Sequence, residues 1–175
     1  TRLLDSILDL SLLERGEAPW RLSRIDPEVA LENSIRTCQG LAAKAGVRLA
    51  SEARAVGAVV EADGDRLSQV FINLLSNAIK YNTNTDPWVR VRSRIAGQAY
   101  EVLVEDNGPG IRPEERELIF SKFLRGWAHT QTAASGAGLG LAISWQIMRR
   151  LGGSLTLVPG STPGACFRVA LPLAS

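Results

Sequence analysis

The sequence predicts an α+β fold: a two-layer α/β sandwich of a mixed sheet with helices on one face, preceded by a helical segment. The first observation is the apolar spacing of helices in several long segments. The second is a set of shorter stretches in which apolar and polar residues alternate, some of them paired across glycine-containing turns. A sheet with one apolar face needs a helical layer to cover it. The chain has 175 residues, 45% of them hydrophobic, which suffices for one such core.

The chain opens in a helical pattern. Leu3, Ile7 and Leu10 are spaced by four and then three residues, which predicts a helix over residues 3–14. This seam is typical of a coiled coil, but any amphipathic helix shares it, and the segment alone favours neither interpretation. Glycine and proline within residues 16–19 end the helix.

Two capped helices form most of the predicted helical layer. Asp26 is an N-cap residue, and Pro27 takes the first helical position of a helix that runs to about Lys44, before Gly46. The second helix covers residues 64–81, where apolar residues again recur at helical spacing.

Short alternating stretches supply the strands, and we expect all of them in one sheet. They are residues 20–25, 47–51, 58–62, 88–95, 100–105, 154–158 and 166–173. Gly97 and Gln98 turn the central hairpin, whose apolar side we expect to face the helices. A short acidic helix over residues 113–120, a loop over 121–137 and a helix over 139–151 complete the prediction.

Composition excludes several classes of protein. The net charge of +2 offers no overall basis for nucleic-acid binding. The longest apolar runs are shorter than the roughly 20 residues of a membrane span, so we expect no direct membrane contact by this chain. Cys38 and Cys166 are far apart, and we expect buried thiols rather than metal ligands. Because the only methionine is Met148, we expect a fragment of a longer protein.

An asparagine pair is the first candidate for function. Asn73 and Asn77 lie four residues apart on one helical face, although asparagine is a poor residue in the middle of a helix. One explanation is structural, with both amides bonded to backbone across the sheet. The other is a magnesium and phosphate face, because an amide oxygen ligates Mg²⁺ without repelling phosphate. On the same side, Lys80 would attract phosphate and Tyr81 would flank a base or sugar.

A carboxylate ends a predicted buried strand. Asp106 follows the apolar residues 102–104 and precedes a turn that contains Gly108 and Gly110. A buried carboxylate is costly unless it is paired, and the exocyclic amine of adenine is a suitable donor. The glycines would let a ring approach the backbone. The alternative is an aspartate that merely caps its own turn.

Three alternate glycines, Gly136, Gly138 and Gly140, precede the last predicted helix. Free N–H groups and the positive end of a helix bind phosphate well. The run is not a Walker loop, because no Gly-Lys-Ser/Thr follows, and no strand leads into it as in a dinucleotide-binding fingerprint. A flexible hinge is the alternative interpretation.

Aromatic and basic residues open the loop before these glycines. Phe120 and Phe123 can anchor a lid, and Lys122 and Arg125 can reach a triphosphate. The alternative is a short helix that packs on the core. His129 is the only histidine, and we expect a solvated side chain without a role.

In this order, the motifs resemble the catalytic ATP-binding domain of two-component sensor histidine kinases, which has the Bergerat ATP-binding fold. Four segments resemble the N box, first glycine box, F box and second glycine box of that family, namely residues 73–82, 106–110, 120–123 and 136–140. The resemblance implies two parts. Residues 1–18 would be the C-terminal end of the dimerisation and phosphotransfer hairpin, and residues 19–175 the catalytic ATP-binding domain.

The resemblance also implies roles for individual residues. Asp106 would bind the adenine amine, and Asn77 would ligate Mg²⁺ and act with Lys80 in catalysis. The implied ATP-binding set is Asn73, Asn77, Lys80, Tyr81, Asp106, Gly108, Gly110, Ile111, Phe120, Lys122, Phe123, Arg125, Gly136, Gly138, Leu139, Gly140 and Leu141. Residues 127–134 depart from the family pattern, because they hold fewer glycines and charges than the lid of many relatives.

By this resemblance the chain is an ATP-dependent protein-histidine kinase with ATP and Mg²⁺ as cofactors. It would donate the γ-phosphoryl to a histidine on the hairpin, for relay to an aspartate of a response regulator receiver domain. The full-length protein would be a homodimer. This part would be cytoplasmic, and the parent can be an inner-membrane sensor.

Asn73 distinguishes kinases from the hydrolases of this fold. ATP-hydrolysing relatives carry glutamate at this place as a general base for water, and an amide cannot take up that proton at neutral pH. We therefore expect this site to hold ATP without hydrolysing it. The alternatives are a nucleotide-sensing scaffold, a serine kinase of the anti-sigma type and a clamp-type ATPase.

Overall fold

The computed structural model describes residues 2–116, 118–120, 139–159 and 163–175. Its main sheet has the strand order β2–β4–β5–β7–β6. The strands are β2 (Arg48–Ser51), β4 (Trp88–Ala96), β5 (Ala99–Asp106), β7 (Cys166–Pro172) and β6 (Ser154–Leu157). The edge strand β2 runs parallel to β4, and the other pairs are antiparallel. The sheet is therefore mixed, as predicted.

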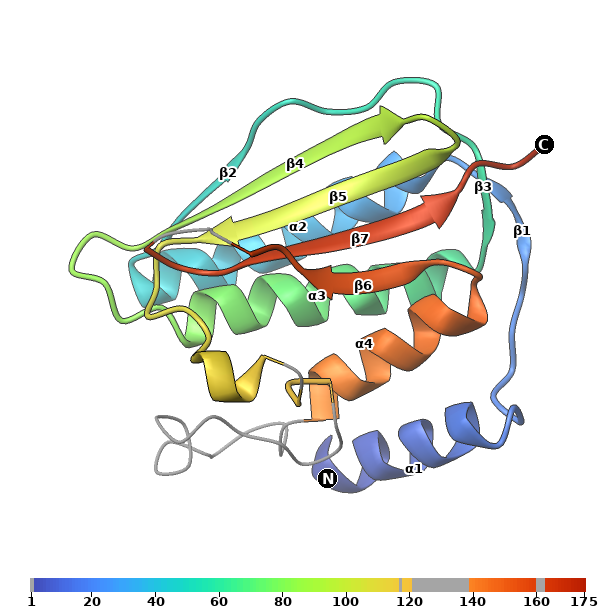
Figure 1. Cartoon of the computed structure of the whole chain (residues 1–175), viewed down its shortest axis with the longest axis horizontal. Helices are drawn as coiled ribbons and strands as arrows, with labels where there is room; N and C mark the ends of the chain where they lie inside the picture. Colours follow the sequence, from blue (N-terminus) through green and yellow to red (C-terminus); the bar gives the residue numbers. More distant parts are fainter. Residues whose placement is uncertain (1, 117, 121–138, 160–162) are drawn as a thin grey trace.

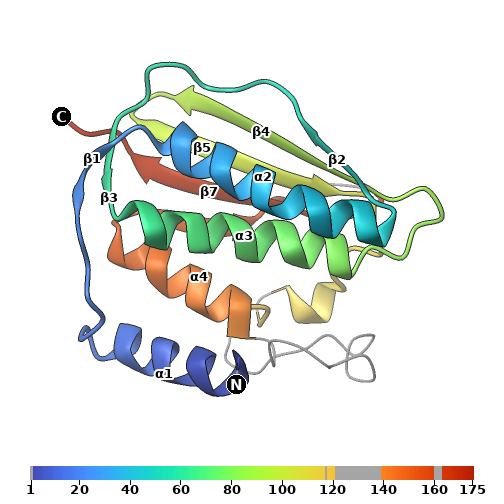
Figure 2. The same cartoon turned by 180° about the vertical axis from the view of Figure 1, so that it is seen from behind.

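Helices cover one face of this sheet, which confirms the predicted layers (Figure 1). The helical layer consists of α2 (Pro27–Ala45), α3 (Gly64–Lys80) and α4 (Leu139–Arg150). The view from behind shows α1 (Arg2–Glu14) beside α4 and away from the sheet (Figure 2). Among the described residues, no helix has both the length and the apolar character that crossing a membrane requires.

Local chemistry sets the ends of the long helices. Asp26 accepts a hydrogen bond from the N–H of Glu28 at 2.9 Å, and Pro27 opens α2. Gly46 ends the helix with a φ of 70°, a left-handed conformation that favours glycine. Asp63 caps α3 in the same way, through two backbone N–H groups. These ends agree with those predicted from the sequence.

The core lies between the sheet and α3. Residues alternate between the two faces of β4 and β5, so Val91, Val102 and Val104 are buried against the helices. Phe71 and Leu74 are buried on the facing side of α3. Burial of one such side chain contributes roughly 1.5–3 kcal/mol. The two apolar periodicities of the sequence thus meet in one core.

Two short strands lie outside the main sheet. β1 (Ser23–Ile25) and β3 (Val60–Ala62) form a separate antiparallel pair, which an isolated bridge between Val60 and Leu173 connects to the end of β7. The prediction of one sheet is wrong for these strands. Each is three residues long and is followed at once by a helix N-cap, so the chain turns away before it can join the larger sheet.

The strand predicted over residues 20–25 is also shorter than expected. The guanidinium groups of Arg66 and Arg150 lie over the ring of Trp20, 5.5 and 5.9 Å from its centroid. The next N–H along the chain donates to the Asp63 carboxylate at 2.8 Å. These contacts take the first residues of the segment away from strand pairing.

The segment after the first glycine box differs from its prediction. A single 3₁₀ turn, Pro113–Glu115, replaces the short acidic helix expected over residues 113–120. Ile119 is buried, and the ring of Phe120 meets that of Phe167 edge to face with centroids 6.2 Å apart. Packing of these side chains on the core competes with continuation of the helix. The loop predicted over residues 121–137 lies outside the described residues.

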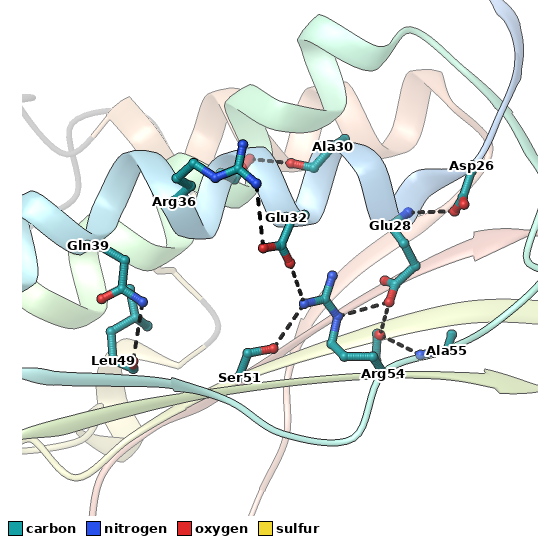
Figure 3. A network of polar contacts seen from close by, with 12 residues as sticks. Asp26, Glu28, Ala30, Glu32, Arg36, Gln39, Leu49, Ser51, Arg54 and Ala55 are labelled. Atoms are coloured by element: carbon teal, nitrogen blue, oxygen red, sulfur yellow. Dashed lines mark hydrogen bonds and ion pairs between the residues drawn. The ribbon is translucent and has the colours of Figure 1, made fainter.

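A charged network fastens α2 to the sheet (Figure 3). Arg54 pairs with Glu28 at 2.9 Å and with Glu32 at 3.0 Å. Glu28 also accepts hydrogen bonds from the hydroxyl groups of Ser93 and Tyr100. Burial and the bond to Glu28 raise the pKa of Tyr100, so its hydroxyl remains a donor at neutral pH. The Glu28 carboxylate is tolerated beneath the sheet because it is paired.

Candidate functional site

The site residues in the described part of the chain belong to three elements, β5, α3 and α4, or follow them directly. Helix α3 contacts both β5 and α4. A Cβ placed on Gly108, after β5, would lie 3.3 Å from the Cα of Asn82, after α3. The side chain of Asn73 in α3 reaches the carbonyl of Gly140 at the start of α4, with Nδ2 and O 3.2 Å apart. The structure therefore brings three of the sequence motifs together at one place.

Asp106 is the last residue of β5 and is held from two sides. Its Oδ1 accepts hydrogen bonds from the N–H of Gly108 at 2.9 Å and of Ala165 at 3.3 Å. Because both bonds end on Oδ1, Oδ2 is the oxygen that can accept from a ligand. Burial raises the pKa of this carboxyl, although the two N–H groups oppose the rise. The bond from Gly108 is the turn-capping bond of the alternative interpretation, and it leaves Oδ2 for binding.

Gly164 is a site residue that sequence reasoning missed. A Cβ on Gly164 would lie 1.9 Å from the backbone oxygen of Asp106 and 2.5 Å from its Oδ1. The backbone N–H of Asp106 also donates to the carbonyl of Ala165 at 2.9 Å. Gly110, with a φ of 75°, packs against the same segment. In the sequence Gly164 looks like an ordinary turn glycine, and only the pairing of β5 with β7 brings it to Asp106.

Asn73 uses its amide donor within the fold. Nδ2 donates to the carbonyl of Gly140 at 3.2 Å and to the hydroxyl of Ser144 at 3.1 Å. The contact is structural, as one interpretation held, but the backbone that it reaches belongs to α4 and not to the sheet. The amide oxygen is then the atom of Asn73 that can face a metal or phosphate.

The other polar residues of α3 lie near its C-terminal end. Asn77 is half-buried and Lys80 is exposed. Tyr81 is the C-cap residue and donates its backbone N–H to the carbonyl of Asn77 at 3.1 Å. An amide oxygen and an ammonium group suit a magnesium ion and phosphate oxygens, respectively.

The apolar members of the predicted ATP-binding set belong to the core or its margin. Leu139 is fully buried, whereas Ile111, Phe120 and Leu141 are partly buried against the core. The contact of Phe120 with Phe167 agrees with the core-packing alternative for that residue. Any contact of these four residues with a nucleotide stays a prediction.

Part of the predicted site lies outside the described residues. These residues are Lys122, Phe123, Arg125, Gly136 and Gly138, together with His129. Their roles stay predictions from the sequence.

A polar cluster beside Asp106 was also missed. Asn107 is 6% exposed, and its Oδ1 accepts hydrogen bonds from the side chain of Asn82 and the N–H of Trp88, both at 2.8 Å. In the sequence these asparagines resemble ordinary turn residues. Their mutual contact depends on two segments that are far apart along the chain.

Comparisons with known proteins find a matching family and similar sequences. The model of a family described as "Histidine kinase-, DNA gyrase B-, and HSP90-like ATPase" matches residues 62–175. Sensor histidine kinase MtrB of Mycobacterium leprae is 33% identical over 171 residues, which are 98% of this chain and 30% of MtrB. The chain therefore spans less than a third of that relative's length.

Solved structures give the same result for the fold. Full-length ShkA, crystallised with AMPPNP, is 28% identical with a TM-score of 0.79, over 99% of this chain and 35% of ShkA. The nucleotide-free catalytic domain of histidine kinase ThkA is 26% identical with a TM-score of 0.74, over 87% of this chain and 95% of that domain.

Proposed function

The chain belongs to the family of histidine kinase-, DNA gyrase B- and HSP90-like ATPases, and we propose that it binds Mg-ATP as the catalytic part of a sensor histidine kinase. In the proposed reaction, the bond between the γ-phosphorus and its bridging oxygen breaks, and a phosphorus–nitrogen bond forms on a histidine of the preceding hairpin. ADP leaves, and the imidazole releases a proton. An aspartate of a response regulator receiver domain then takes the phosphoryl group.

The Asp106 carboxylate is the observation that carries this proposal. It ends a buried strand, its Oδ1 is held by two backbone N–H groups, and its Oδ2 can accept from the amine of adenine. Gly108, next to it, has no Cβ to obstruct a flat ring. A fixed, partly desolvated acceptor discriminates well, because a ligand without the matching donor leaves it unpaired.

The phosphate side of the proposed site belongs to α3 and α4. Asn77 would ligate Mg²⁺, whose positive charge would offset the negative charge of the phosphates, and Lys80 would add a second positive charge. The N-terminal end of α4 presents backbone N–H groups and a partial positive charge, which favour an anion. These residues would bind and orient the triphosphate. Their contribution to the reaction would be position and charge, with little covalent chemistry by the protein.

We also propose that the chain consists of two parts. Residues 1–18 would be the end of the dimerisation and phosphotransfer hairpin, and residues 19–175 the ATP-binding domain. Helix α1 lies outside the two-layer structure, which supports its assignment to the hairpin and not to the ATP-binding domain (Figure 2). The full protein would be a homodimer, with this part in the cytoplasm and an inner-membrane sensor as one form of the parent.

Substitution of Asp106 tests the proposal. In Asp106→Asn the side-chain oxygen can still accept from the N–H groups of Gly108 and Ala165. The new NH₂ group then takes the place of Oδ2 and faces the adenine amine, so that two donors meet. We expect the affinity for Mg-ATP to fall at least about tenfold in calorimetry. Asn77→Ala, in a longer form that includes the preceding helices, should abolish labelling by γ-phosphate-labelled ATP.

Glu61→Gln is the matched control, because it removes an exposed carboxylate on β3, outside the site. This variant should keep both the affinity for Mg-ATP and the labelling by γ-phosphate-labelled ATP. Normal ATP affinity in Asp106→Asn, together with normal labelling in Asn77→Ala, would contradict the assignment of the site.

A further inference from the structure

An asparagine cluster joins two halves of the proposed site. Asn107, directly after Asp106, is 6% exposed. Its Oδ1 accepts from Asn82 Nδ2 and from the N–H of Trp88, both at 2.8 Å, and its Nδ2 donates to the carbonyl of Asp86 at 2.9 Å. Two bonds to the oxygen and one from the nitrogen determine which way the buried amide is turned.

Asn82 and Asn84 complete this cluster, which we call the asparagine clamp. Asn82 Nδ2 also donates to the carbonyl of Trp88 at 3.2 Å, and its Oδ1 accepts from the N–H of Asn84 at 3.1 Å. Asn84 Nδ2 donates to the carbonyl of Asn107 at 2.9 Å. A Cβ on Gly108 would be 3.3 Å from the Cα of Asn82, so the backbones also lie close together. The segment after α3 is therefore bonded to both the side chain and the backbone of Asn107.

The clamp lies one residue from the proposed ligand contacts on each side. Asn107 follows Asp106, the proposed acceptor for the base. Asn82 follows Tyr81, the C-cap of the helix that carries Asn77. If the clamp opened, the carboxylate would move relative to the helix end that faces the phosphates. Displacements of about 1 Å are costly in sites that depend on orientation.

We propose that Asn82 and Asn107 are positioning residues that determine the preference of this site for adenine over guanine, an inference that rests on the proposed function. They act through Asp106. Its Oδ2 can accept from the exocyclic amine of adenine, whereas guanine carries an acceptor oxygen at that position. Discrimination therefore depends on where Oδ2 lies, and the clamp fixes the turn that begins directly after Asp106.

The test compares two nucleotides in one chain. Dissociation constants for Mg-ATP and Mg-GTP are measured by calorimetry for the wild-type chain, for Asn82→Ala and for Thr83→Ala, an exposed neighbour in the same segment. We expect the wild type to prefer ATP and Thr83→Ala to match it. Asn82→Ala should lose about tenfold of the ATP-to-GTP preference, because it removes the amide that donates to Asn107 Oδ1 and to the carbonyl of Trp88. An equal loss of affinity for both nucleotides would indicate a general structural role and overturn the inference.

A second variant keeps the test decisive if Asn82→Ala does not fold. Asn84→Ala removes the bonds to Asn107 and to the N–H of Asp86 but leaves the buried amide paired. It should reduce the preference about threefold, and an unchanged preference would overturn the inference. A wild-type chain that binds neither nucleotide would overturn the proposed function as well. A wild-type chain that prefers ATP, with variants that keep the preference, would overturn the clamp alone.

Discussion

Gly164 is the residue with the least room for a side chain among those near Asp106. Its absent Cβ would overlap the Asp106 carbonyl at 1.9 Å, and backbone atoms cannot yield as a flexible side chain can. We expect Gly164→Ala to lower the free energy of unfolding by about 3 kcal/mol, the upper part of the usual range for overpacking. Urea denaturation of the purified chain measures it.

Gly40→Ala is the control for this substitution. Gly40 is exposed within α2, and a Cβ there would meet nothing within 4 Å. Alanine is the better helix former, so this variant should gain up to about 1 kcal/mol. Equal stability of the two variants would contradict the close approach of Gly164 to Asp106.

The Asp106 carboxyl also predicts a pH dependence. Burial raises its pKa above the ordinary value of 3.8 in the folded chain. Its contribution to folding is therefore full below 3.8 and is lost as the pH rises through the raised pKa. In the proposed site, the affinity for nucleotide would depend on pH in the opposite direction, because the ionised carboxylate is the form that accepts a hydrogen bond from the adenine amine.

We therefore expect the affinity for Mg-ATP to fall as the pH drops toward the raised pKa. The comparison is between the wild-type chain and Asp106→Asn, with the dissociation constant measured at each pH. ATP titrates too, but its contribution is common to both proteins. The same pH profile in both would contradict the role of the carboxylate.

Helix α1 is an element whose position depends on a few contacts. Leu10 and Leu13 are buried, and α1 packs against α4. Asp9 pairs with Arg66 at 2.8 Å and accepts from Gln69 at 2.9 Å, both on α3. The pair is largely shielded from solvent, so it is screened less than an exposed ion pair. Sequence periodicity predicts this helix, but not where it docks.

Asp9→Ala should loosen α1 and leave α3 unchanged. It removes the acceptor of Gln69 Nε2 and one acceptor of Arg66, whose guanidinium keeps its bond to Gln69 Oε1. The loss costs about 1–2 kcal/mol at this degree of burial. Hydrogen exchange in α1 should therefore accelerate. Asp5→Ala, at an exposed position of the same helix, controls for the change in charge and helix propensity. Faster exchange in both variants, or in neither, would contradict the docking contact.

For the chain as a whole, patterns that act over a few residues were predictable. The cap at Asp26 and the hairpin turn at Gly97 set elements that the structure has where the sequence predicts them. The separate β1–β3 pair was not predictable, because strand pairing depends on how distant segments meet. The same applies to Gly164 beside Asp106, since register between β5 and β7 decides that contact.

The candidate site follows the same rule. Its polar motifs were visible because asparagine is unfavourable in the middle of a helix and a carboxylate at the end of a buried strand is costly unless it is paired. The second use of Asn73, to hold α4 through Gly140 and Ser144, became visible only when the two helices were side by side. The clamp of Asn82 and Asn107 was hidden for the same reason.

The proposed function is tested by phosphorus NMR of this chain with Mg-ATP, followed for hours. We expect perturbed ATP signals and negligible release of inorganic phosphate, because in the proposed site Asp106 binds the base and Asn73 cannot act as a general base for water. Steady release of phosphate would contradict a site that holds ATP for a histidine. Unperturbed ATP signals at millimolar protein would contradict nucleotide binding itself.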